Sequence, residues 1–369
     1  MAYSNGIDAP AAHFTITLYT GDGSNGRAIT NIANAGDFQP DWLWYKERSN
    51  TSEHRAFDSS RGNSKRIEPN NTNQEATDTT NHQSFDSNGF TIGNSGSTNA
   101  NGDTYVAWQW IANGGSTTTN DASATSIGTI DSVYQANTTA GFSIVTYTGT
   151  GSNGTIAHGL GATPKVVIIK NRDRTETWRW GDTINESGFG KQLLLNDTDA
   201  IATDNNTFND TNPTSTVFSV GTRNATNASG EKLVAYCFAE KKGYSQFGTY
   251  LGDGNIDGPF LYMGFRPKYL LIKRTDSTGS WFIIDSVRDI ASLGAANTEG
   301  SADSQHKQLF ADAGDAEGTY NSSAGDFTSN GYKLRSTNNS TNASGGTFIY
   351  FAFAEHPFVT SEGTPVTAI

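Results

Sequence analysis

The chain has 369 residues, a formal net charge of −12 and an apolar fraction of 34%. An acidic balance of this size disfavours nucleic acid and anionic membranes as partners. No run approaches the roughly 18 apolar residues that a spanning helix needs, so no membrane insertion is expected. Abundant Gly, Ser, Thr and Asn would suit disorder, but 7 Trp, 14 Tyr and 20 Phe provide core area. Long helical periodicity is absent, so the composition predicts short strands joined by polar turns.

The N-terminal segment and the single cysteine indicate neither a targeting signal nor a reactive site. Residues 1–8 show neither a basic region nor an apolar run, so no secretory signal peptide is expected and synthesis in a cytoplasm is predicted. Cys237 is the only cysteine, which excludes an intrachain disulfide and a cysteine-based zinc site. It lies in an apolar run and is predicted to be a buried, inert thiol.

A set of short motifs recurs three times along the chain, and its first member is an opening strand. Alternating residues run from Phe14, Phe142 and Phe247 into glycine-containing turns. Such turns predict a tight reversal after each opening strand.

The second repeated motif is a proline, one charged residue, four apolar residues and a lysine. Its three copies are Pro40–Lys46, Pro164–Lys170 and Pro267–Lys273. Four successive apolar residues indicate a strand buried on both faces or a short buried helix, and the entry proline favours the strand. We therefore predict the central strand of a repeated unit, with the lysine marking the point where the strand reaches water.

Later motifs complete each unit. Aromatic or mixed strands are expected at 54–59, 178–182 and 281–286. The Asn-Gly pairs at 88–89 and 330–331 predict hairpins with type I′ turns. A Thr-Asn-Ala-x-Gly turn then precedes closing strands at 105–110, 233–238 and 348–353, which alternate large and small residues.

These patterns predict an all-β fold of three tandem antiparallel β-sandwich, jelly-roll-like units of about 100 residues each. The predicted organisation is residues 1–115 for the first unit, 116–140 for a Ser/Thr/Asn-rich linker, 141–242 and 243–358 for the second and third units, and 359–369 for a polar tail. The second and third units are joined closely and are expected to pack together, whereas the linker sets the first unit apart.

The combined motifs resemble a repeated domain of uncharacterised function in predicted virion and tail-fibre proteins of marine bacteriophages, including cyanophages. The resemblance extends from Phe14 to Phe358 and rests on turn glycines and core strands. It implies a component of a phage particle and transfers no catalytic or binding residue. The first unit departs most, because it lacks the Gly-Leu-Gly at 159–161 that precedes the proline and has a longer polar insertion.

No residue is assigned a catalytic, cofactor-binding or metal-binding role. The six histidines do not recur at matching positions, and no hydrolase, zinc or phosphate-loop motif is present. Acidic turns at Asp22, Asp253 and 312–315 could offer oxygen ligands to calcium, but aspartate beside glycine is more often turn chemistry.

Trp178 and Trp180 are the candidate glycan-binding residues, because alternate residues of a strand share a face. If that face is exposed, the two indole rings form a platform for sugars. If it is buried, they belong to the core, and burial is the commoner case.

The expected function is that of a non-enzymatic bacteriophage virion structural protein, in a tail fibre, spike or other appendage that contacts the host surface. Alternatives are a capsid decoration protein or head fibre, and a carbohydrate-binding adhesion module. The expected partners are other virion proteins, further copies of the chain and a host surface glycan. Fibres are commonly trimers, although no heptad stalk is present to enforce one. The expected location is the virion, released by lysis.

Overall fold

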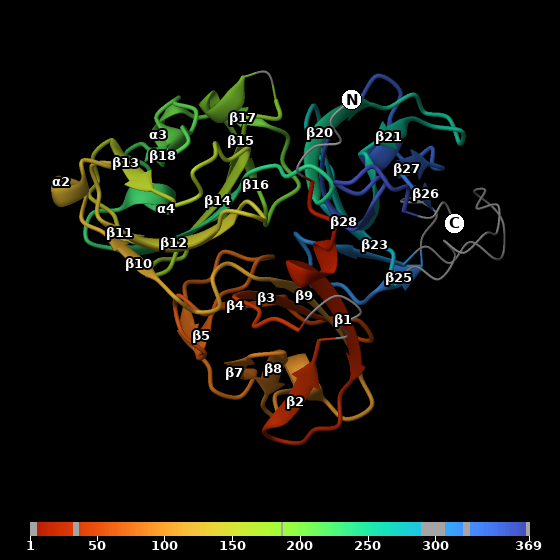
Figure 1. The fold of residues 1–369 in the computed structure, drawn as a ribbon, viewed down its shortest axis with the longest axis horizontal. Coiled ribbons are helices and arrows are strands. Elements are labelled where there is room, and N and C mark those ends of the chain that lie inside the picture. Colours follow the sequence, from red (N-terminus) through yellow and green to blue (C-terminus); the bar gives the residue numbers. More distant parts are fainter. Residues whose placement is uncertain (1–5, 32–36, 186, 289–306, 320–324, 367–369) are drawn as a thin grey trace.

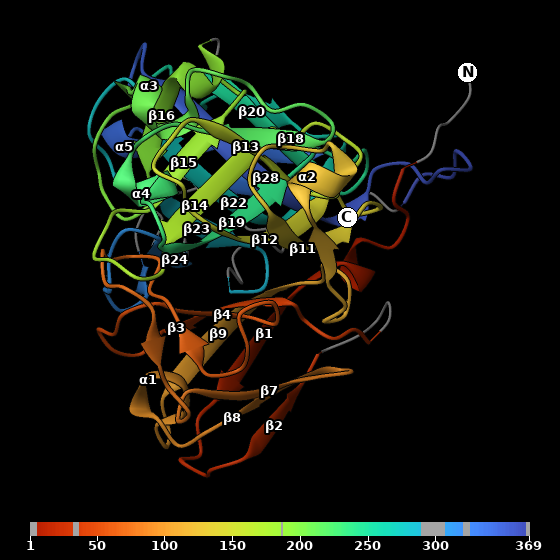
Figure 2. The same ribbon diagram turned by 90° about the vertical axis from the view of Figure 1, so that its left-hand side faces the viewer.

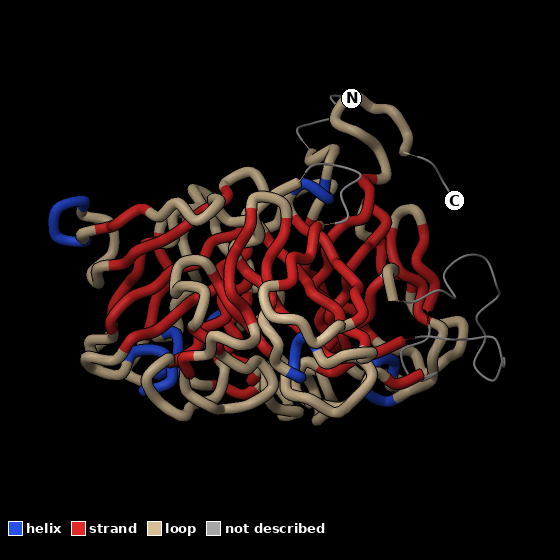
Figure 3. The backbone as a smooth tube through the Cα atoms, turned by 90° about the horizontal axis from the view of Figure 1, so that it is seen from below, coloured by secondary structure: helices blue, strands red, loops and turns tan. Residues whose placement is uncertain are grey.

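The computed structural model describes residues 6–31, 37–185, 187–288, 307–319 and 325–366. The fold is all-β with antiparallel sheets, as the composition predicts, and its helices are single short turns (Figure 3). The strands form three lobes around a common centre (Figure 1), and the first lobe lies below the other two in the side view of Figure 2. Parts of the expected third unit and both chain ends lie outside the described residues.

The first lobe has a four-stranded sheet of order β1-β9-β3-β4 and a three-stranded sheet of order β2-β8-β7. Its elements are η1 (Pro10–Ala12), β1 (Phe14–Thr20), β2 (Arg27–Thr30), β3 (Trp42–Glu47), β4 (Arg55–Asp58), β5 (Lys65–Arg66), β6 (Ala76–Thr77), β7 (His82–Asp86), β8 (Gly89–Ile92), α1 (Gly96–Asn99) and β9 (Thr104–Trp110).

The second lobe has an eight-stranded sheet of order β10-β11-β12-β19-β14-β15-β16-β17, faced by the pair β13-β18. Its elements are β10 (Thr118–Asn120), α2 (Ala122–Thr125), β11 (Ser132–Asn137), β12 (Phe142–Thr148), β13 (Gly154–Ala157), β14 (Val166–Asn171), β15 (Arg179–Asp182), η2 (Gly188–Gly190), β16 (Lys191–Leu194), β17 (Ala202–Thr203), α3 (Asn205–Phe208), β18 (Val217–Val220), α4 (Asn224–Asn227) and β19 (Lys232–Phe238).

The third lobe has a six-stranded sheet of order β20-β28-β22-β23-β24-β25 and a three-stranded sheet of order β21-β27-β26. Its elements are β20 (Ser245–Leu251), β21 (Phe260–Tyr262), β22 (Phe265–Arg274), β23 (Phe282–Asp285), β24 (Lys307–Phe310), β25 (Gly318–Thr319), β26 (Gly325–Thr328), β27 (Gly331–Leu334), α5 (Asn339–Asn342) and β28 (Thr347–Pro357). The opening, closing and motif strands therefore neighbour one another in the same order in all three large sheets.

The prediction of a linker at 116–140 is wrong. This segment contains β10, α2 and β11, and β11 pairs along its whole length with β12 from Ser132↔Tyr147 to Asn137↔Phe142. The second lobe therefore begins before residue 141. Its polar composition misled the prediction because the edge strand β10 and its neighbour β11 both leave several side chains exposed or partly exposed to water.

The tail after Phe358 folds back onto the third lobe. The amide of Phe358 donates to the carbonyl of Gly264 at 3.1 Å, and Val359 forms a bridge with Pro365. Ser361 donates its amide and hydroxyl to the carboxylate of Asp8 at 2.7 and 2.5 Å. The two described ends of the chain are therefore tied together at this point; residues 367–369 of the expected tail lie outside the described residues.

The motif strands β3 and β14 are buried at every residue, and β22 is buried through its apolar run, which confirms strands covered on both faces. On one face, each large sheet packs against the small sheet of its own lobe. The opposite faces of all three large sheets meet in one apolar cluster at the centre. The first unit is therefore not set apart from the other two.

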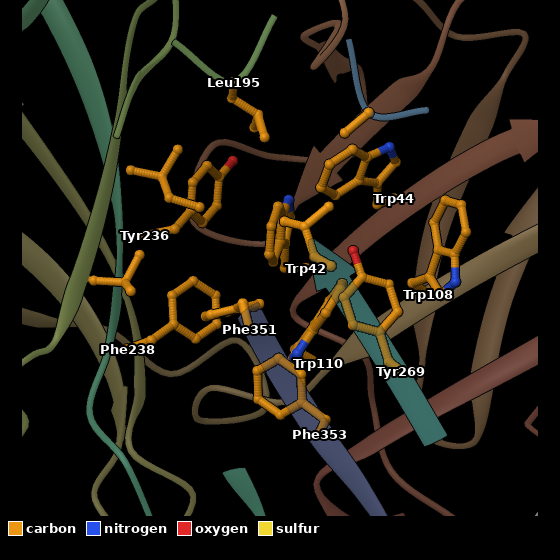
Figure 4. Packing of buried hydrophobic residues seen from close by; sticks show 14 of the residues in the cluster. Trp42, Trp44, Trp108, Trp110, Leu195, Tyr236, Phe238, Tyr269, Phe351 and Phe353 are labelled. Carbon is orange, nitrogen blue, oxygen red and sulfur yellow. The ribbon is translucent and has the colours of Figure 1, made fainter. Parts of the chain in front are cut away.

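Aromatic rings dominate this shared core (Figure 4). Trp42 of the first lobe stacks on Tyr236 of the second at a centroid distance of 4.4 Å. Phe14, also of the first lobe, contacts Phe353 of the third at 5.1 Å, and Phe238 of the second contacts Phe351 of the third at 5.0 Å. Each lobe thus contacts both others through large rings, whose burial supplies much of the area in a core.

A buried asparagine explains the repeated Thr-Asn-Ala turn. The Oδ1 atom of Asn227 accepts from the amide of Thr150 at 2.8 Å, and its Nδ2 donates to the carbonyls of Ser152 and Gly221. Asn99 and Asn342 make the equivalent bonds in the other lobes. The side chain therefore fastens the turn after the opening strand to the turn before the closing strand.

The glycine of the Ser-Asn-Gly motif is required by a close approach of two backbones. The hairpins β7–β8 and β26–β27 form as predicted, but their two-residue loops are 87–88 and 329–330 rather than the Asn-Gly pairs. A Cβ on Gly89 would lie 2.1 Å from the carbonyl oxygen of Ile29, and one on Gly331 would lie 2.1 Å from that of Leu261. Glycine therefore allows the neighbouring edge strand to pair, and the predicted type I′ turn is wrong.

Replacing Asn227 by alanine is expected to lower the free energy of unfolding by about 3 kcal/mol, because buried backbone groups lose their partners. Urea denaturation measures the change. Asn224→Ala, at an exposed position three residues earlier, is the control and is expected to have little effect. A loss below about 1 kcal/mol in Asn227→Ala would show that the turns are held by other contacts.

Replacing Ile168 by aspartate is expected to unfold all three lobes together. Ile168 lies in the shared core, and a buried unpaired charge costs several kcal/mol. Limited proteolysis should leave no resistant fragment ending near Gly115, whereas Ile127→Asp, at an exposed position, should remain resistant. A stable fragment of the first lobe alone would show that this lobe folds independently.

Candidate functional site

The predicted glycan platform of Trp178 and Trp180 is wrong, because both side chains are fully buried. Trp178 donates its indole N–H to the carbonyl of Glu68 at 2.9 Å, across the boundary with the first lobe. Trp180 lies 4.9 Å from Trp281 of the third lobe, between ring centroids. Both residues therefore join lobes, and neither can meet an external ligand.

Backbone hydrogen bonds close the three lobes into a ring through equivalent positions. The residue two places after each motif lysine accepts from a loop of a neighbouring lobe. The bonds run from Glu75 N to Arg172 O at 2.8 Å, from Glu317 N to Arg48 O at 2.8 Å and from Ile201 N to Thr275 O at 2.9 Å. A second equivalent set joins Glu176 N to Thr72 O, Ser52 N to Gly314 O and Gly279 N to Thr198 O. The three interfaces thus share one backbone geometry.

Two of the three interfaces also contain a buried ion-pair network. Between the first and second lobes, Arg61 contacts Asp58 at 2.5 Å and Glu75 at 2.9 Å, and Glu75 also binds Arg172 at 2.7 Å. The hydroxyl of Tyr236 donates to Asp58 at 2.6 Å. Burial is offset here because each carboxylate is paired with an arginine and each arginine with a carboxylate.

The interface between the third and first lobes repeats this network. Arg288 contacts Asp285 at 2.6 Å and Glu317 at 3.1 Å, while Arg48 binds Glu317 at 2.8 Å. Trp108 donates its indole N–H to Asp285 at 3.2 Å, in the place of the Tyr236 hydroxyl. Arg48 and Arg172 hold the pKa of Glu317 and Glu75, respectively, below the ordinary value against the opposing effect of burial.

The interface between the second and third lobes lacks this network among the described residues. Asn185 stands where the other lobes have Arg61 and Arg288, and burial raises the pKa of its partner Asp182. Phe351 occupies the place of Tyr236 and Trp108, and packs against Trp180 at 5.5 Å. In the part of the chain that the structure describes, two interfaces of the ring therefore contain the ion-pair network and the third does not.

His54 occupies the place of Trp178 and Trp281 in the first lobe. Its Nδ1 accepts from the indole of Trp44 at 2.7 Å, so the proton resides on Nε2, which donates to the carbonyl of Ala313 at 3.1 Å. Burial holds the pKa of His54 well below 6.5, and the ring is neutral at physiological pH. The sequence did not reveal this equivalence, because histidine and tryptophan differ in size and polarity. The property that they share here is a ring N–H that donates to a backbone carbonyl.

The motif lysines do not reach water as predicted; Lys46, Lys170 and Lys273 are fully buried. Each ammonium donates to backbone carbonyls, and two of them reach into the neighbouring lobe. Lys170 donates to Thr72 at 3.2 Å and Glu176 at 2.9 Å, and Lys273 donates to Thr198 at 2.9 Å and Gly279 at 2.8 Å. Carbonyl oxygens replace water for these charges, although burial still lowers each lysine pKa from 10.5 to about 8.

A cavity of about 600 Å³ lies on the third lobe, beside the edge strand β21. Tyr262, Met263 and Phe265 form part of its wall, with the folded-back segment 358–361, the connection at 240–243 and the start of β20. Its charged lining side chains are Glu240 and Lys242. Its volume is typical of small-molecule sites, which span roughly 300–1,000 Å³.

Large exposed apolar side chains gather in the same lobe. Tyr262 is 60% exposed, Phe260 43% and Leu251 66%. Phe260 and Tyr262 alternate along β21 and share its outer face. Neither residue was singled out from the sequence, because an alternating strand pattern does not say which face is covered.

Other kinds of site find no support among the described residues. In these ranges no group of three or more His, Cys, Asp or Glu side chains is placed to hold a metal ion. None of the described helices has the length and apolar character that crossing a membrane requires. Cys237 is buried, and burial raises the pKa of its thiol.

Comparison with known proteins places the chain in a family. The profile of the family described as "Domain of unknown function (DUF7483)" matches residues 9–357. This span covers most of the chain, and the chain belongs to that family. No curated protein and no solved structure matches it.

The buried lysines are expected to make the free energy of unfolding rise with pH between about 8 and 9. In this range the unfolded chain, with a lysine pKa of 10.5, binds more protons than the folded chain, with a pKa of about 8. Above about pH 9, ionisation of Cys237 and then of tyrosines in the unfolded chain opposes the effect, because burial raises the pKa of these groups in the folded chain. Replacing Lys170 by methionine should reduce the slope by up to ~1.4 kcal/mol per pH unit.

Urea denaturation across this pH range measures the slope. Lys232→Met, at an exposed position, is the matched control and should leave the slope unchanged. An identical slope in Lys170→Met and the parent chain would show that Lys170 keeps an ordinary pKa in the folded state.

Proposed function

We propose that this member of the DUF7483 family is a non-enzymatic structural protein of a bacteriophage virion, built from three jelly-roll-like sandwich units. Its most suitable place is a tail fibre, spike or other appendage that contacts the host surface. The observation that carries the proposal is the closed ring of three lobes, held by equivalent backbone bonds at all three interfaces. The motif resemblance to predicted virion and tail-fibre proteins supports the same role.

The ring favours a scaffold because its polar residues are used to hold lobes together. The aspartates, arginines and lysines that are buried most completely lie in the interfaces, where they pair with one another or with backbone carbonyls. Such groups stabilise one arrangement of the lobes and are not presented to a substrate. A particle component needs this kind of rigidity, because it must keep its shape outside the cell.

The expected partners are other virion proteins and further copies of the chain. Fibre subunits commonly associate as trimers. In this protein the three lobes of a single chain are arranged around a common centre, as three subunits of a trimer would be. A homo-oligomer would therefore be an assembly of complete rings, since the apolar faces of the three large sheets already meet inside each ring. The expected location is the virion, after synthesis in the host cytoplasm and release by lysis.

A capsid decoration protein or head fibre is the second candidate, because the same rigid ring would serve on a head. A carbohydrate-binding adhesion module is the third. It is favoured by the exposed aromatic strand β21 beside a cavity, and no longer by Trp178 and Trp180.

Particles purified from a lysate of the virus that encodes the chain are expected to contain it as a stoichiometric component. Mass spectrometry of intact, density-purified particles tests this, with a non-structural protein of the same virus as the control. Antibody labelling in electron microscopy should place the chain on the tail rather than the head. Absence from intact particles would contradict the proposal, and labelling of the head would select the decoration protein.

A further inference from the structure

The three lobes provide an internal comparison at their edge strands. Pairing aligns Ile29 with Phe90, Ile156 with Phe218 and Leu261 with Tyr332, so these three inward residues are equivalent. The outward residues on either side of them differ between lobes. They are Ala28 and Thr30 in the first, Thr155 and Ala157 in the second, and Phe260 and Tyr262 in the third.

The aromatic pair has no structural task that the other lobes require. The inward residue of each strand is buried in its own lobe, and small outward residues suffice for the fold in the first two lobes. In the second lobe, moreover, Ile130 forms a bridge with Ile156 and pairs with the free edge of β13. In the third lobe β21 is the edge of its sheet, and its two rings remain substantially exposed. An exposed pair of large aromatics confined to one repeat indicates a binding surface.

The cavity beside Tyr262 has the chemistry of a site for an uncharged, hydroxyl-rich ligand. The lining contains one carboxylate, Glu240, and one ammonium, Lys242, and therefore has no net charge. Ser245, Gln246, Thr360 and Ser361 add hydroxyl and amide groups. Hydroxyl and amide groups of this kind form hydrogen bonds with the hydroxyls of an uncharged ligand.

The Glu240 carboxylate is held in place for such a contact. Its Oε2 lies 2.7 Å from Lys165 Nζ, and its Oε1 accepts from the amide of Phe247 at 2.7 Å. A carboxylate has about four acceptor positions, so further hydrogen bonds remain available. Asp8 holds Ser361, another lining residue, by accepting a hydrogen bond from its amide.

We propose that this cavity binds a neutral saccharide, with the ring of Tyr262 packed against the apolar C–H face of a sugar. Glu240 would accept hydrogen bonds from the sugar hydroxyls. Phe260, on the same face of β21, would extend the contact to a second sugar residue. This inference deepens the proposed function, because contact with a host surface would use this site. The biological role of the site rests on that proposed function.

Saturation-transfer NMR on the purified full chain tests the proposal. The probes are the methyl glycosides of glucose, galactose, mannose and N-acetylglucosamine at millimolar concentration, with 3′-sialyllactose as a charged comparison. At least one neutral glycoside is expected to bind. Tyr262→Ala should weaken that binding by about tenfold or more, the equivalent of ~1.4 kcal/mol.

Leu251→Ala is the matched control, because Leu251 is exposed in the same lobe and does not line the cavity. Circular dichroism should show that both variants remain folded, since both side chains are exposed. Gln246→Leu should also weaken binding, because leucine has a similar size but lacks the side-chain amide that glutamine contributes to the cavity.

Three results would overturn the inference: no binding of any neutral glycoside, unchanged binding in Tyr262→Ala, or binding of sialyllactose alone. The assay uses isolated protein, so it is independent of particle composition. Absence of the chain from virions would leave saccharide binding intact, whereas failure here would leave a structural role in the particle intact.

Discussion

The structure depends on sheets whose central strands are apolar on both faces. Such a sheet needs two apolar partners, because burying area is the dominant favourable term in folding. The small sheet of the same lobe covers one face. The other face can be covered only by equivalent faces of the other lobes, and three of them meet around Trp42, Tyr236 and Phe353. The ring follows from this requirement.

Closing the ring buries polar groups, which then need hydrogen-bond partners. The same backbone hydrogen bonds form at each interface, but the side chains that pair there differ. Two interfaces use an Asp–Arg–Glu network, and the third replaces the buried arginine by Asn185 and a hydroxyl by Phe351. A charged network gains little net free energy over apolar packing, but it strongly penalises a wrong partner. The differences between interfaces therefore favour one cyclic order of the lobes.

The sequence was sufficient to predict the all-β class, the repeated core strands and the closing strands, because apolar runs report burial directly. It could not reveal what covers each face. Lys170 was expected in water because a sequence does not show that loop carbonyls of another lobe surround it. Trp178 was ambiguous for the same reason. The segment 132–137 was taken for a linker because a polar strand near the edge of a sheet has the composition of a loop.

The candidate site was beyond prediction because it arises from segments distant in sequence. Tyr262 and Gln246 meet the folded-back residues 358–361 only in the folded chain. Once the lobes are aligned by their strand pairing, however, the repeats show which positions the fold requires and which it does not. Inward positions keep apolar residues in all three lobes, as the fold requires. An outward position that changes from threonine or alanine to an exposed aromatic ring is not explained by the fold, and this difference is the basis of the binding surface that we propose.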